Sequence, residues 1–409
     1  MNGDIYVVGN FTEYESNTVP GIVKFTKNPI YPYDYQYDSS FDAYVDSLIS
    51  VNSDDGKIDI NTVAVDMTGK VYIGGNFTYD IQGGTYFSYD LVRLNSNGTL
   101  DTSFYNVTPG ANRGTGSSIG NKIYDIEIVN GPGGERIYVG GSFSSMSLKS
   151  GFHANQCLML INNDGTVNTT FTSNISSASL NCSSGGVVDI EKSILPTTAS
   201  AYEVIVGGKF SFVSISTKYS LMKYNLSSGV GGVLATFNNN VSMTFSDTVT
   251  AIQQVDGGPH SGKIVYSKEM AGPSYSLGML DYSSASQVTV FNSNFNMTTS
   301  SANFGSEIGG AGGGIKGIEQ FGGQLVIVGD FMLTGLSRSM ATVNLEGMFT
   351  GGDFGFMESS GNSIDFQKSV LKILPLSYPN SPKAIFAGNI DQFHNLGGSG
   401  SAHRIFGLP

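Results

Sequence analysis

The sequence predicts an all-β protein, a seven-bladed β-propeller of four-stranded antiparallel blades. Three observations predict it: a motif that recurs seven times, a repeated order of short strands, and a turn-rich composition without helical periodicity. The motif is a strand, a turn of small residues and a large apolar residue. Its copies end at Phe11, Phe77, Phe143, Phe210, Met270, Phe331 and Ile390, spaced 66, 66, 67, 60, 61 and 59 residues apart. A fixed period of this kind is typical of repeat folds.

Each unit has three recognisable strands. In repeat two these are a first strand at 62–65, the anchor strand that carries the motif, and a third strand at 91–94. An Asn-Gly or Asp-Gly hairpin turn follows at 95–99 and 162–166. Units then close on another phenylalanine, after which we expect a fourth, outer strand: Phe104, Phe171, Phe237 and Phe291. An open β-solenoid or a string of β-sandwiches would also fit the strand order.

The anchor motif has a physical reason in a propeller. Blades taper toward the axis, and Gly-Gly lets neighbouring backbones approach. The next large ring fills the gap between blades, and this packing role is assigned to Phe11, Phe77, Phe143, Phe210 and Phe331. Repeat five departs from the motif with Ser267-Lys-Glu-Met270, so its blade is expected to pack less regularly.

The run Ile-Tyr-Val-Gly-Gly-x-Phe, followed by Leu-Val-Arg-Leu-Asn-Ser-Asn-Gly-Thr-Leu-Asp-Thr-Ser-Phe, resembles the delta-sixty repeat β-propellers. The match is close at 69–104 and 135–171, partial in repeats one, four and six, and weak in repeats five and seven. The resemblance implies a propeller, usually extracellular or attached to the cell surface. It brings no catalytic motif and no site residues.

The domain organisation is expected to be one propeller over 1–409. Repeat one lacks a first strand, and repeat seven ends after its third strand. We therefore expect the chain to be part of a longer protein, or a strand from another subunit to fill the gap. No signal peptide is visible, since strand residues begin at Gly3.

Composition restricts the partners and the location. The net charge is −12 and only 13% of residues are charged, while 54 glycines and many Ser, Thr and Asn supply the polar surface. An acidic surface repels phosphate backbones, which excludes nucleic acid as a partner. There is no apolar run long enough to insert into a membrane. The profile favours an extracellular, cell-surface or virion-surface protein.

The two cysteines, Cys157 and Cys182, flank one outer segment of repeat three. In an oxidising compartment they could pair and close a loop of 26 residues. Two separate thiols, one of them on a buried strand, fit the sequence equally well.

No catalytic or metal site is predicted, and no cofactor. Gly116-Ser-Ser118-Ile-Gly120 spells a nucleophile elbow, but no helix is expected after it. The four histidines lie in different repeats and form no metal spacing. The first strands offer few acids for catalysis near the axis: Asp125, Glu127, Asp189 and Glu319.

A row of tyrosines is the main candidate for an interface. Tyr31, Tyr33, Tyr35 and Tyr37 alternate along one face of an extended segment, which Pro32 places at an edge. Exposed tyrosines suit a protein interface or sugar stacking, although the rings could equally pack on their own blade. Further aromatics in the long loop of repeat two extend the candidate surface: Tyr79, Tyr86, Phe87 and Tyr89.

The chain also carries ten Asn-x-Ser/Thr sequons, some expected by chance. Glycosylation is expected first in outer turns and loops, at Asn168, Asn174, Asn225, Asn240 and Asn296. In a source that does not glycosylate, the same residues are ordinary turn residues.

The favoured function is a non-enzymatic extracellular or surface structural protein, a rigid scaffold that self-assembles as a subunit of a fibril, appendage or virion. The first alternative is a carbohydrate- or receptor-binding module, as in a phage tail or an adhesin. The second is a propeller lyase or glycosidase, which would need convergent acids, histidines or arginines near the axis.

Overall fold

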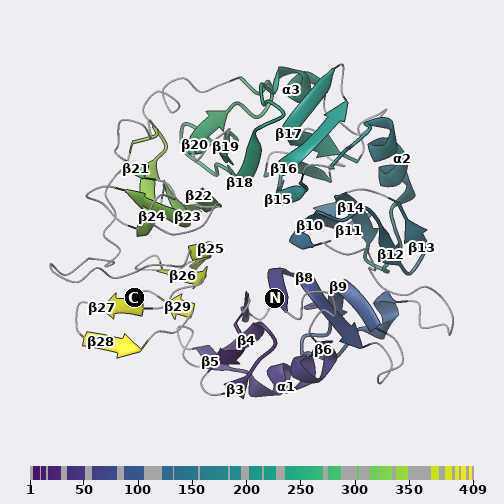
Figure 1. The fold of residues 1–409 in the computed structure, drawn as a ribbon, viewed down its shortest axis with the longest axis vertical. Coiled ribbons are helices and arrows are strands. Elements are labelled where there is room, and N and C mark those ends of the chain that lie inside the picture. Colours follow the sequence, from purple (N-terminus) through teal and green to yellow (C-terminus); the bar gives the residue numbers. More distant parts are fainter. Residues whose placement is uncertain are drawn as a thin grey trace. The chain divides into compact units, whose positions relative to one another are not determined.

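The computed structural model (Figure 1) describes residues 3–9, 11–14, 17–28, 35–50, 58–80, 87–105, 122–131, 133–154, 157–182, 185–194, 202–213, 216–226, 235–269, 275–286, 302–303, 314–321, 323–333, 338–348, 370–376, 383–388, 392–395, 398–401 and 405–407. The chain divides into two compact units. One comprises 1–192, 196–217 and 223–234, and the other 193–195, 218–222 and 235–409.

The described backbone is all-β, with one main sheet in each repeat. Repeats one to four form β1–β4–β5 (Ile5–Val8, Ile22–Lys27, Tyr35–Tyr37), β7–β8–β9 (Asp59–Val65, Val71–Asp80, Phe87–Leu94), β10–β11–β14 (Ile123–Gly131, Gly134–Gly141, Leu158–Asn162) and β15–β16–β17 (Val187–Lys192, Glu203–Val213, Thr217–Asn225). Repeats five to seven form β18–β19–β20 (Thr248–Gln254, Ile264–Glu269, Tyr275–Leu280), β22–β23–β24 (Gly314–Phe321, Gln324–Leu333, Arg338–Asn344) and β25–β26–β29 (Val370–Leu376, Lys383–Gly388, Ile405–Gly407).

Short strands accompany these sheets. β6 (Ile49–Ser50) pairs with the far end of β8, and β21 (Ala302–Asn303) with the far end of β23. Three hairpins stand apart: β2–β3 (Glu13–Tyr14, Asn17–Thr18), β12–β13 (Met146–Leu148, Gly151–His153) and β27–β28 (Gln392–Asn395, Gly398–Ser401). Within the described ranges, no helix has both the length and the hydropathy to cross a membrane.

The predicted order of first, anchor and third strand is confirmed in repeats two to seven, where the anchor strand lies between the other two. In the first unit, β7 packs on β10 and β10 on β15, so successive sheets meet through their first strands. In the second unit, β18 packs on β22 and β22 on β25 in the same way. Repeat one differs, because its anchor strand β1 pairs with β4 alone among the described strands.

The Gly-Gly pairs do bring backbones together, and the two glycines do so in different ways. A Cβ on Gly140 would lie 2.4 Å from Val187 of the next sheet. A Cβ on Gly141 would lie 2.1 Å from the carbonyl oxygen of Lys122 in its own sheet. The second contact arises because β10 carries a bulge between Ile123 and Asp125.

Six of the described sheets contain a first strand, and the same bulge occurs in each of these strands: β7, β10, β15, β18, β22 and β25. The bulge was not predicted from the strand pattern. Repeat five keeps the bulge although Ser267 and Lys268 replace the two glycines, with the Ser267 hydroxyl 2.6 Å from the Thr250 hydroxyl.

The hairpin turns have the predicted geometry, with φ of 89° at Gly98 and 84° at Gly165. Each turn also contacts the preceding repeat. A Cβ on Gly98 would lie 2.6 Å from the carbonyl oxygen of Phe41, and one on Gly165 would lie 2.1 Å from that of Phe104. Glycine is therefore required for the backbone angle and for the approach.

The predicted fourth, outer strand after the closing phenylalanine is not confirmed in the described residues. Phe104 ends a 3₁₀ turn, η1 (Thr102–Phe104), Phe171 lies in α2 (Thr169–Ser177) and Phe237 in α3 (Ala235–Asn240). Phe291 lies outside the described residues. The main sheets consequently have three strands rather than four, apart from the short additions β6 and β21.

Capping residues explain the helical turns at η1 and α2. Asp101 precedes η1 and accepts a hydrogen bond from the Ser103 amide (3.1 Å), while Asn168 precedes α2 and accepts one from the Phe171 amide (3.0 Å). Asp38 does the same for α1 (Ser39–Leu48), accepting from the Phe41 amide at 3.1 Å. An Asp or Asn three residues before a buried phenylalanine thus caps the N-terminus of a helical segment in these three repeats. The sequence contains this signal, although no helix was predicted from it.

The anchor rings lie inside the protein. Phe11, Phe77, Phe143 and Phe210 are at most 6% exposed, which suits their packing role. Phe331 lies on β23, and its side chain is outside the described part of the structure.

Candidate functional site

A buried cation recurs on the third strand and links consecutive sheets. Arg93 of β9 is 3% exposed, lies 2.9 Å from Asp101 and stacks over the Phe104 ring at 4.3 Å. Its guanidinium also donates to the backbone and side chain of Asn163, in the hairpin turn of the next repeat. We call Arg93, Asp101, Phe104 and Asn163 the cation clamp.

Repeat one contains an equivalent arrangement. Lys24 of β4 is 6% exposed and lies 3.3 Å from Asp4 and 3.2 Å from Asp38. Its ammonium donates to the Ser96 carbonyl in the next repeat's turn (2.9 Å) and lies 5.8 Å from the Phe41 ring centroid. In both repeats the buried cation therefore links consecutive sheets. Its charge is paired with carboxylates and backbone carbonyls of the protein itself.

Repeat three has apolar and neutral residues at the same two places. Leu160 takes the position of Arg93, and the capping residue is Asn168 in place of Asp101. Cation and anion are thus exchanged together for an uncharged pair, which agrees with the high free-energy cost of burying either charge alone.

Asp125, one of the acids considered for catalysis, joins three successive sheets. Its carboxylate accepts from the Thr62 hydroxyl of β7 (3.3 Å) and from the Ile190 amide of β15 (2.8 Å). Glu127 pairs with Lys192 of the following sheet at 3.4 Å. These acids are engaged in bonds between sheets, and among the described residues no cluster of three or more potential metal ligands occurs.

The tyrosine row is partly described. Tyr35 and Tyr37 lie on β5 and are half-buried, and the Tyr37 ring packs on Tyr14 of the β2–β3 hairpin (4.9 Å) and on Phe25 of its own sheet (6.4 Å). Tyr31 and Tyr33 lie outside the described residues. The Tyr37 side chain therefore packs partly on neighbouring rings of repeat one and is partly exposed to solvent.

The prediction that the candidate surface extends into repeat two is wrong at Tyr79. Its side chain is fully buried, with its ring 5.8 Å from Tyr105, because the end of β8 continues as strand and turns this residue inward. Phe87 and Tyr89 lie on β9, where only their backbone is described, and Tyr86 lies outside the described residues.

Asp42 of α1 is a buried carboxylate that the sequence analysis did not single out. It is 3% exposed. Burial raises the pKa of Asp42 to about 6. Hydrogen bonds from the Tyr37 side chain and the Lys24 backbone lower this pKa. The nearby carboxylates of Asp38 and Asp46 raise it.

This carboxylate should make stability depend on pH. The folded state binds the Asp42 proton more tightly than the unfolded chain, so its contribution is most favourable below about pH 4 and is lost as the pH rises through about 6. We expect Asp42→Asn to raise stability at pH 7 by about 2 kcal/mol and to flatten this slope. Urea unfolding at pH 4 to 7 measures it, with the exposed Asp164→Asn as control. Equal slopes in wild type and Asp42→Asn would contradict the assignment.

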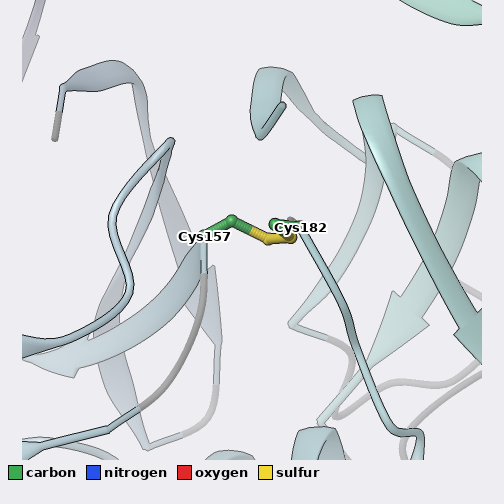
Figure 2. The surroundings of a disulfide bond; sticks show 2 residues. All are labelled: Cys157 and Cys182. Atoms are coloured by element: carbon green, nitrogen blue, oxygen red, sulfur yellow. A yellow bond between two sulfur atoms is a disulfide. The ribbon is translucent and has the colours of Figure 1, made fainter. Parts of the chain in front are cut away.

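The cysteines form a disulfide (Figure 2). Cys157 and Cys182 have Cα atoms 6.1 Å apart. Cys157 immediately precedes β14, and Cys182 follows α2 on the way to β15. Next to it, Asn181 pairs with Ser211 of β16. The bond therefore ties the third sheet to the segment that enters the fourth.

Reducing this bond should destabilise the protein. Closing a loop of this length restricts the unfolded chain, and its loss is expected to cost about 2 to 3 kcal/mol. Thermal unfolding with and without a phosphine reductant measures the loss. The double variant Cys157→Ala/Cys182→Ala should unfold like the reduced wild type and should not respond to the reductant. A response of that variant would show that the reductant acts elsewhere.

The structure divides the candidate glycosylation sites. The prediction of an accessible glycosylation site is wrong at Asn225. This residue is fully buried on β17, with its side-chain amide 3.3 Å from Glu203. Asn168 and Asn174 are half-buried on α2 and its cap, and Asn296 lies outside the described residues. Asn240 is exposed, although its amide donates to the Ser284 carbonyl at 2.7 Å. Asn97, another of the ten sequons, is exposed in a hairpin turn.

In a host that glycosylates secreted proteins, we expect sugar at Asn97 and Asn240 but not at Asn225. At Asn97 the side-chain oxygen accepts from the Thr99 hydroxyl at 2.7 Å, which presents the sequon in an open turn. Enzymatic deglycosylation in heavy-oxygen water followed by peptide mass spectrometry measures occupancy. Modification of Asn225 would contradict the burial argument.

Comparison with known proteins places residues 68–104 in a family model described as a β-propeller domain of unknown function (DUF5122). No curated protein matches the chain. Among solved structures, the chain is similar to a protein of unknown function from Bacteroides caccae, with 13% identity over 85% of this chain and 92% of that one, and a TM-score of 0.36.

Proposed function

We propose that the chain is a seven-bladed β-propeller of the delta-sixty type that serves as a non-enzymatic structural protein outside the cell or on a virion, as a subunit of a larger assembly. One observation carries the proposal: buried and half-buried charges lie in bonds between consecutive sheets, at Lys24, Arg93 and Asp125. Such bonds favour a rigid scaffold, and the disulfide favours an oxidising compartment.

The assembly role predicts self-association of the purified protein. Light scattering after size exclusion and negative-stain microscopy would reveal oligomers or filaments, and Tyr35→Ala should weaken them. Tyr44→Ala is the matched control, because Tyr44 is 51% exposed but lies on α1 outside the tyrosine row. A monomer at all concentrations would overturn the assembly role.

A carbohydrate-binding role is the second candidate, and one observation favours it. Phe245 is 65% exposed and stands edge-on to the Tyr219 ring at 6.0 Å. The exposed apolar face of such a ring suits stacking on a sugar. A glycan array with wild type and Phe245→Ala tests it, and binding that is unchanged by the substitution would remove the pair from consideration.

A further inference from the structure

A lysine, a glutamate and an asparagine lie together inside the fourth sheet. Glu203 belongs to β16, and Lys223 and Asn225 belong to β17. The three residues are 1%, 2% and 0% exposed. The Lys223 ammonium lies 3.3 Å from Oε1 of Glu203, and the Asn225 side-chain amide donates to Oε2, also at 3.3 Å. One buried carboxylate therefore contacts both an amine and a carboxamide.

Lys223 and Asn225 are spaced so that their side chains can react with each other. Residues two apart on a strand point to the same face, with Cα atoms about 6.6 Å apart. An extended lysine side chain spans this distance, so its amine can reach the Asn225 carboxamide without a shift of the backbone. The shared Glu203 carboxylate already holds the two nitrogen atoms on one side of β17.

Repeat two has a different cation at the equivalent position. Arg93 stands where repeat four has Lys223, and Asn95 stands where it has Asn225. A guanidinium keeps its charge and does not act as a nucleophile, whereas a lysine amine does once it has lost its proton. The change from arginine to lysine therefore places a nucleophile two residues from an amide, beside a carboxylate that can accept a proton.

We propose that Lys223 and Asn225 form an intramolecular isopeptide bond, an amide between their side chains, and that Glu203 is the catalytic acid and base for it. The protein makes this bond itself after folding, without a cofactor or a second substrate. A sugar transferase would need access to Asn225 from solvent, but a bond made inside the folded protein does not. The bond removes the buried charge of Lys223 and fixes the end of β17. It does not depend on the assembly role.

The reaction balances with the groups present. Burial of a charge costs free energy, so transfer of a proton from the Lys223 ammonium to Glu203 leaves two neutral groups that suit the interior. The neutral amine then attacks Cγ of Asn225, and the Nζ–Cγ bond forms. Glu203 gives its proton to Nδ2 and accepts the second proton that Nζ loses. The Cγ–Nδ2 bond breaks, ammonia leaves, and no group is oxidised or reduced.

Peptide mass spectrometry of the purified protein, digested after denaturation and reduction, tests the bond. We expect the peptide with Lys223 and Asn225 to weigh about 17 Da less than its sequence, because ammonia has left. Trypsin should not cleave after Lys223. Lys223→Arg, which copies repeat two, should restore the full mass, and so should Asn225→Ser and Glu203→Gln. Lys218→Arg is the matched control and should keep the loss, because Lys218 of the same strand donates to the backbone carbonyl of Asn239.

The wild-type peptide decides the proposal whether or not the variants fold. Full mass after prolonged incubation of the folded protein would overturn it. A loss of about 17 Da that persists in Lys223→Arg would also overturn it, since Asn225 would then have closed on its own backbone. A loss of about 18 Da would overturn it as well, because water would then have left and the bond would join Lys223 to Glu203.

Discussion

Replacing Asp101 by asparagine is expected to lower the free energy of unfolding by about 3 to 5 kcal/mol, the usual consequence of leaving one partner of a buried ion pair unmatched. Arg93 is 3% exposed and lies 2.9 Å from Asp101, so its charge would stay buried without its counter-ion. Lys70, 3.0 Å from the same carboxylate, can turn to solvent because it is 31% exposed. Chemical denaturation at pH 7 measures the loss.

The double variant Arg93→Leu/Asp101→Asn separates charge from packing. It copies repeat three, where Leu160 and Asn168 occupy these positions. We expect it to recover about 2 kcal/mol or more relative to Asp101→Asn, a positive coupling between residues in contact. Asp164→Asn is the matched control, because Asp164 lies exposed in a hairpin turn and should change stability by less than about 1 kcal/mol. An Asp101→Asn variant as stable as this control would contradict the clamp.

The sequence predicted the strands of these repeats better than the segments between them. Short apolar runs that recur in each repeat predicted strands such as β7 and β10, since such a run is a local property of the sequence. The helices were missed because Asp38, Asp101 and Asn168 act as caps in segments too short for a periodic apolar face.

The candidate site was less predictable, for a physical reason. Burial of Tyr79 and Asn225 depends on which side of a strand faces a neighbouring sheet, which strand pattern alone does not reveal. The cation clamp joins Arg93 to Asn163, 70 residues apart. Spacing near the repeat length is a signal that could have identified it. Acidic residues that seemed available for chemistry, such as Asp125, proved to join successive sheets.

The second prediction with a large effect concerns the bulge. We expect Gly141→Ala to destabilise the protein by about 3 to 4 kcal/mol, because overpacking against a backbone cannot be relieved by a side-chain rotation. The new Cβ would lie 2.1 Å from the Lys122 carbonyl oxygen and 3.0 Å from the Ile123 Cα, and both atoms belong to the main chain of β10 or its lead-in. Thermal unfolding should show a melting temperature lower by about 6 to 12 °C.

Gly9→Ala is the matched control, since Gly9 has the same place in repeat one, where no first strand lies beside it among the described residues. Among the described residues its Cβ would contact the Phe11 ring alone, at 3.3 and 3.5 Å, and a small ring shift relieves this contact. We expect a change of less than about 1 kcal/mol, because the restriction that alanine places on the unfolded chain offsets the ring shift. Equal losses at Gly9 and Gly141 would mean that glycine serves the anchor turn itself. A loss confined to Gly141 would tie the need for glycine to the bulged strand that lies beside it.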